Sequence, residues 1–120
     1  MEKTHEKQLQ GLIESLQHYI AKIPNGSNKI AELLREGNND SAYKAIGDFV
    51  EGMEWITSSL KILSENNYGI TFDSEHLNKL LLELNDALTK QDEGLIADLF
   101  DYEIADFFEV VGKLELIKTN

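Results

Sequence analysis

Apolar residues recur three and four positions apart along most of this chain. In its first part they stand at Leu9, Leu12, Ile13, Leu16, Tyr19, Ile20 and Ile23. An α-helix turns once in about 3.6 residues, so this spacing places these side chains on one helical face. A β-strand would need alternation with period two, and no such run of β-branched or aromatic residues occurs in the sequence. The spacing therefore predicts an all-α protein.

Turn-forming residues predict where the first helices end. Proline lacks a backbone donor and disfavours helix in the residue before it, and Asn-Gly is common in turns. The triplet Pro24-Asn25-Gly26 is therefore predicted to end the first helix. Ser27 has the chemistry of a helix N-cap and Gly37 that of a helix end. We expect one short helix between them, with Ile30, Leu33 and Leu34 facing inward.

Three longer helices are predicted to follow. Asp40 is expected to cap a helix over roughly residues 41–65, and Asp73 or Ser74 to cap the next one. Asp92 is expected to cap the last, over roughly residues 93–117. The inward faces are Ile46, Phe49, Met53, Ile56, Leu60 and Leu63, then Leu77, Leu80, Leu81, Leu84 and Leu88, then Phe100, Ile104, Phe107, Val111 and Leu114. Residues 66–73 form a loop in which Tyr68, Ile70 and Phe72 are expected to cover one end of the bundle.

Four long amphipathic helices with short connections predict an antiparallel four-helix-bundle-like fold with one extra short helix. No helix can bury its apolar stripe alone, and no linker interrupts the pattern, so residues 1–120 are expected to form one helical domain. The sequence also contains a faint internal repeat. Asn39-Asp40 precedes a helix that leads to Asp48-Phe49, and Gln91-Asp92 precedes one that leads to Asp98-Leu99. The two copies align only with a two-residue shift.

The charge balance is strongly acidic. There are 22 acidic and 11 basic side chains, and the formal net charge is −11. Nucleic acids and anionic membranes both require a basic surface, so neither is an expected partner. A basic protein partner is compatible with this charge, as is mimicry of nucleic acid, while plain solubility is the simpler explanation. The first residues lack the apolar stretch of a signal peptide, and we expect a cytoplasmic protein.

Residues for catalysis or metal binding are sparse. The chain has no cysteine, and its glycines form neither a dinucleotide-binding motif nor a phosphate-binding loop. A di-iron helical bundle needs paired inward Glu-x-x-His motifs, and the one such motif here ends at His5. Asp73 and His76 have similar spacing, but Asp73 is better explained as a cap, and Glu14 and His18 have the spacing of a surface pair. We therefore expect no metal, no cofactor and no enzymatic activity. A metal-dependent helical enzyme is the alternative from another functional class.

A second stripe lies on the helix predicted over residues 41–65. The residues Gly52, Trp55, Ser59 and Ile62 again step by three and four, and Trp55 lies opposite Ile46 on a helical wheel. Small residues allow another backbone to approach, and tryptophan is enriched at the centres of interfaces. The stripe therefore predicts contact with a second copy or a partner protein. The alternative is that a neighbouring helix or the Tyr68–Phe72 loop covers Trp55 within the same chain.

The last predicted helix carries an acidic strip. Its residues are Asp98, Asp101, Asp106 and Glu109, which lie opposite the phenylalanine face. The strip is either a solvated helix back or a docking surface for a basic partner.

Two strings resemble known sequences. The segments Asp48-Phe49-Val50-Glu51-Gly52-Met53-Glu54-Trp55 and Ile96-Ala97-Asp98-Leu99-Phe100-Asp101-Tyr102-Glu103-Ile104 look like those of small, uncharacterised helical proteins of Gram-positive bacteria. The resemblance covers roughly residues 30–110. It implies an all-helical cytoplasmic domain and assigns no active site.

The expected function is therefore that of a non-enzymatic helical interaction protein, self-associating or binding a protein partner. The first alternative is an acidic chaperone or inhibitor that engages a basic partner, either as a nucleic-acid mimic or in the manner of an export chaperone.

Overall fold

The computed structural model describes residues 2–70, 73–111 and 116–118. Its helices are α1 (Glu2–Arg35), α2 (Asn39–Glu65), α3 (Ser74–Thr89) and a last helical segment formed by α4 (Glu93–Asp98), η1 (Leu99–Ile104) and α5 (Ala105–Val111). Two three-residue strands, β1 (Tyr68–Ile70) and β2 (Leu116–Lys118), complete the fold. The predicted all-α, bundle-like fold is confirmed.

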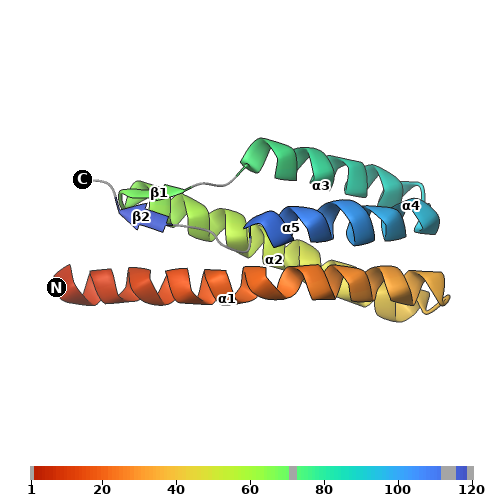
Figure 1. Cartoon of the computed structure of the whole chain (residues 1–120), viewed down its shortest axis with the longest axis horizontal. Helices are drawn as coiled ribbons and strands as arrows, with labels where there is room; N and C mark the ends of the chain where they lie inside the picture. Colours follow the sequence, from red (N-terminus) through yellow and green to blue (C-terminus); the bar gives the residue numbers. More distant parts are fainter. Residues whose placement is uncertain (1, 71–72, 112–115, 119–120) are drawn as a thin grey trace.

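The longest helix sets the shape of the molecule. At about 1.5 Å per residue, the 34 residues of α1 span roughly 51 Å, close to the 52 Å long axis of the structure. Helix α1 packs along α2 and along the α4–η1–α5 segment, which in turn packs on α3 (Figure 1). Within the described residues, no helix has both the length and the apolar character that crossing a membrane requires.

The predicted helix end at Pro24 is wrong, because α1 runs through Pro24 to Arg35. Residues 27–36 are mostly helical, but they continue α1 instead of forming a separate helix, and Ser27 is not an N-cap. The reason lies in the buried seam, which stays in phase across the proline at Ile23, Ser27, Ile30 and Leu34. A proline inside a helix costs about 3 kcal/mol. Burying Ile30 and Leu34 stabilises the helix by roughly 1.5–3 kcal/mol each, which offsets that cost.

Helix ends follow the predicted chemistry in most places. Asp73 accepts a hydrogen bond from the His76 N–H at 3.0 Å, and Asp92 accepts one from the Leu95 N–H at 3.1 Å, so both caps are confirmed. The predicted Asp40 cap is wrong, because α2 begins at Asn39 and Asp40 lies in its first turn. Gly37 ends α1 with a φ of 81°, a left-handed conformation that favours glycine.

The turn after α1 and the turn after α3 use the same hydrogen bonds. The Asn38 N–H donates to the Leu33 carbonyl at 2.9 Å, and the Asp92 N–H donates to the Ala87 carbonyl at 3.0 Å. Gly37 in the first turn corresponds to Gln91 in the second, and both have positive φ. Asn39 and Glu93 also occupy equivalent positions, since they are 54 residues apart, as Gly37 and Gln91 are. The Asn39 side-chain amide donates a hydrogen bond to the Glu93 carboxylate at 3.4 Å. The structure therefore contains two helical hairpins with equivalent turns, in which Asn39 corresponds to Glu93 and not to Gln91 as the sequence repeat suggested.

The chain after α5 differs from the prediction. The last helix was expected to reach residue 117, whereas residues 116–118 form β2, which pairs antiparallel with β1. Within the predicted loop, Tyr68 is buried at the end of the bundle as expected, and its hydroxyl donates to Glu6 at 2.7 Å. Phe72, Leu114 and the side chain of Ile70 lie outside the described residues.

The core contains the predicted apolar faces. Ile46, Phe49, Met53, Ile56 and Leu63 are buried in α2, and Leu77, Leu80 and Leu84 in α3, while Leu60, Leu81 and Leu88 are half-buried. Phe100, Ile104 and Phe107 are buried, with Val111 half-buried at the edge. Phe49 and Phe100 meet edge to face with ring centres 5.1 Å apart, which joins the two hairpins.

Candidate functional site

A groove of about 620 Å³ separates α2 from α3. In the described part of the chain these two helices have almost no close backbone contact, because α2 packs on α1 and β1 while α3 packs on α4 and η1. Apolar side chains from both helices form most of its walls: Val50 and Met53 from α2, and Leu81, Leu84 and Leu88 from α3. The groove is therefore an apolar channel with a helix on each side.

The position of each side chain follows from its step along the helix. Met53 and Leu84 belong to the buried seams and form the floor. Val50 lies one step beside the α2 seam and is 41% exposed. Among the described residues that line the groove, Glu54 is the one ionisable side chain, and none is a lysine or an arginine. An apolar surface with an anionic edge is suited to a partner that is apolar on one side and basic on the other.

The Gly52–Trp55–Ser59–Ile62 stripe lies along the contact between α2 and α1. The Tyr19 ring of α1 covers Gly52 so closely that a Cβ at Gly52 would overlap the Tyr19 hydroxyl. Ser59 is buried, whereas Trp55 and Ile62 remain 37% and 46% exposed. Trp55 meets Tyr19 edge to face, with ring centres 5.6 Å apart. Part of the stripe therefore packs within the chain, and Trp55 and Ile62 still present apolar surface.

Tyr19 has a perturbed acidity in this contact. Partial burial raises the pKa of the Tyr19 hydroxyl above 10.0, and the negative charge of Asp48 raises it further. Both effects disfavour the tyrosinate, because it would be poorly solvated and would face a carboxylate.

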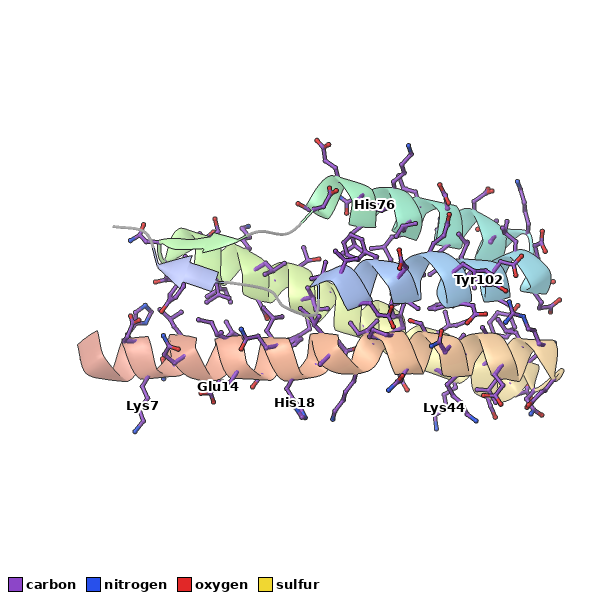
Figure 2. All side chains as sticks on the ribbon, in the orientation of Figure 1. Lys7, Glu14, His18, Lys44, His76 and Tyr102 are labelled. Carbon is purple, nitrogen blue, oxygen red and sulfur yellow. The ribbon has the colours of Figure 1, made fainter. Side chains whose placement is uncertain are left out.

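The acidic strip is divided between two environments. Asp98 and Asp101 receive hydrogen bonds from the Arg35 guanidinium at 3.0 and 2.8 Å. These two carboxylates raise the pKa of Arg35, with Asp101 the larger contributor. The guanidinium also lies 5.8 Å from the ring centre of Tyr102, which faces outward on η1 (Figure 2). Asp106 and Glu109 are exposed on α5, beyond the π-helical turn of η1.

The histidines do not gather at one place. His18 and Glu14 project from the outer side of α1, while His76 lies on α3 (Figure 2). The His76 ring packs edge to face on Phe107 at 5.3 Å, and the His5 ring lies 2.8 Å from the Asn66 side-chain oxygen. Among the residues the structure describes, no group of three or more His, Asp or Glu side chains is arranged to hold a metal ion.

Comparison with known proteins gives a family. The model of a domain of unknown function, DUF8042, matches residues 11–113. The chain belongs to the DUF8042 family. The match begins in α1 and extends just past α5, so the DUF8042 domain contains the helical bundle, including both walls of the groove. No curated protein and no solved structure matches the chain.

Sequence reasoning missed the groove in this DUF8042 domain. Leu81 and Leu88 were predicted to face inward and Val50 was not, and only the separation of α2 from α3 makes all three line an open groove. Arg35 was missed as well, because its partners are more than 60 residues away. The burial of Ser27 could have been predicted from the sequence, because Ser27 continues the three-four spacing of the α1 seam across Pro24.

Proposed function

We propose that this protein is a non-enzymatic interaction protein of the cytoplasm that holds an amphipathic helix of a partner protein in the α2–α3 groove. The observation that carries the proposal is the groove itself: two helices of one bundle stand apart over an apolar floor. Amphipathic helices bind such grooves by inserting their apolar face. The resemblance to helical proteins of Gram-positive bacteria supports a bacterial source.

Charge favours a basic partner over a second copy. Two copies of this chain would each bring a net charge of −11, and the resulting repulsion opposes self-association. A helix with lysine or arginine along its polar side would instead face Glu54 at the edge of the groove. The same charge disfavours nucleic acid and anionic membranes as partners. The exposed Asp106 and Glu109 and the surface around Trp55 and Ile62 are further contact areas for a large partner.

The test uses a synthetic amphipathic peptide of leucine and lysine and a matched peptide of leucine and glutamate. We expect the basic peptide to bind and its affinity to fall as salt is added, since exposed charges are screened over about 10 Å at 0.1 M salt. Val50→Asp places a charge in the groove and should raise the Kd at least tenfold, measured by fluorescence anisotropy. Val110→Asp is the matched control, because Val110 is 77% exposed on α5 and does not line the groove.

Three results would overturn the proposal. One is equal binding of the acidic peptide. Another is an equal loss of affinity in Val50→Asp and Val110→Asp. The third is a dimer in sedimentation that Val50→Asp dissociates, which would make a second copy the occupant of the groove.

A further inference from the structure

A separate cavity of about 290 Å³ lies between α1 and α2, away from the α2–α3 groove. Its walls are apolar where Ile23, Ile30 and Phe49 line it. Gly26 lies at its exposed rim, where a Cβ would meet nothing within 4 Å. The volume of the cavity gives room for an apolar group between the two helices.

One buried polar group lines this cavity. Ser27 is only 1% exposed, and among the residues that the structure describes no group makes a hydrogen bond with its hydroxyl. Buried polar groups are almost always hydrogen bonded, so a buried hydroxyl without a partner, in a residue that lines a cavity, indicates a missing acceptor or donor. A serine within a helix commonly bonds to the carbonyl four residues earlier, but Ser27 does not.

Cationic side chains also line the cavity. Lys22 and Lys29 are exposed and stand two helical turns apart on α1, on either side of Gly26. Lys29 lies 3.8 Å from Glu32, an exposed and loose pair. Asp48 of α2 contributes one carboxylate. The described part of the lining thus carries two cations and one anion, a local excess of positive charge in a chain whose net charge is −11.

We propose that this cavity binds a small apolar carboxylate. The apolar body would occupy the space beside Gly26, Ile30 and Phe49, and the carboxylate would pair with Lys22 or Lys29. A rotation of the Ser27 side chain toward the cavity would give its hydroxyl a hydrogen-bond partner on the ligand. Small-molecule sites are concave and mostly apolar, with a few placed polar groups, and this volume lies at the lower end of their usual range. The ligand is therefore about the size of a phenylpropanoic acid. This inference does not rest on the proposed function.

The test titrates the full-length protein with hydrocinnamate and follows backbone amide shifts by NMR. We expect shifts centred on residues 19–30 and 45–49 and a Kd below about 10 mM, in the range of weak small ligands. Hydrocinnamyl alcohol, which lacks the charge, should bind about tenfold more weakly. L-phenylalanine distinguishes a simple acid from an amino acid, because its ammonium group can pair with Asp48. Tighter binding than hydrocinnamate would identify an amino-acid site, and weaker binding a site for simple acids.

Variants distinguish binding in the cavity from unspecific binding to the protein surface. Gly26→Leu fills the cavity and should abolish binding, and Ser27→Ala and Lys22→Gln should each weaken it. Gly47→Leu and Lys44→Gln are the matched controls on α2, and neither residue lines the cavity. Should Gly26→Leu fail to fold, Ala45→Leu fills the same space from α2. Absence of binding at about 10 mM, or equal binding by the alcohol and by the filled variant, would overturn the proposal.

Discussion

At Gly52 the absence of a side chain makes room for an aromatic ring. The Tyr19 ring lies over the Gly52 backbone and against Trp55, so one glycine allows α1 and α2 to pack through an aromatic pair. The small residue was predicted to admit another backbone, and in the structure it admits a side chain of the same molecule.

Gly52→Ala tests this contact. The new Cβ would overlap Tyr19, and relieving the overlap means displacing the ring from Trp55. We expect a loss of about 1–2 kcal/mol in the free energy of unfolding, within the usual cost of overpacking. Gly47→Ala is the control, because its Cβ meets nothing within 4 Å. There we expect a gain approaching 1 kcal/mol from helix propensity. Equal effects in urea denaturation would show that Tyr19 adjusts without cost.

Tyr19 also makes stability depend on alkaline pH. The pKa of Tyr19 is raised in the folded protein, so above about pH 10 the unfolded chain releases this proton while the folded chain keeps it. The free energy of unfolding should therefore fall as the pH rises through 10, until the pH passes the raised pKa. Tyr19→Phe keeps the ring and removes this contribution. Parallel stability curves for the two proteins from about pH 9 to about pH 11 would contradict the expectation.

Among the elements, the ends of the two hairpins offer a matched comparison. Gly37 and Gln91 occupy the same position in the same turn, with φ of 81° and 53°. Glycine adopts this conformation without steric cost, whereas other residues pay about 1–2 kcal/mol for it.

Gln91→Gly should therefore raise the free energy of unfolding by about 1 kcal/mol, and Gly37→Gln should lower it by about as much. Chemical denaturation of both variants measures the two effects. A loss of stability in Gln91→Gly would mean that contacts of the glutamine side chain outweigh the backbone strain.

The elements also show what sequence reasoning can and cannot reach. The buried seams of α2 and α3 follow from three-four spacing alone, although α2 also buries Ser59 of its second stripe. The predicted helix end at Pro24 was wrong because the apolar seam of α1 continues to Leu34 and outweighs the local effect of the proline. Strand β2 was not predicted because its partner β1 lies more than 40 residues earlier in the chain, and local spacing does not reveal such a pairing. The groove depends on the distance between α2 and α3, which no spacing within either helix encodes.

At the scale of the whole molecule, long-range contacts hold the hairpins in register. Arg35 at the end of α1 bonds to Asp98 and Asp101 on the opposite hairpin, and its pKa is raised by both. At the other end, the Gln10 side-chain amide donates to the Tyr68 hydroxyl at 3.2 Å and ties α1 to β1. The helices are thus fastened at both ends, while the groove between α2 and α3 stays open.

The repeated hairpin turn has a consequence for how chains can combine. The α1–α2 and α3–α5 hairpins meet through equivalent positions, as the bond between Asn39 and Glu93 shows, and the connection between α2 and α3 joins them. The α3–α5 hairpin of another chain would present to the α1–α2 hairpin the same surface as its own α3–α5 hairpin does. Exchange of hairpins between two chains would rebuild the Arg35 ion pairs and the Phe49–Phe100 contact without any new interface. The topology therefore permits domain-swapped dimers. It also permits open-ended assemblies in which each molecule exchanges a hairpin with the next. The length of the α2–α3 connection decides whether the two hairpins pack within one chain or with those of a neighbour.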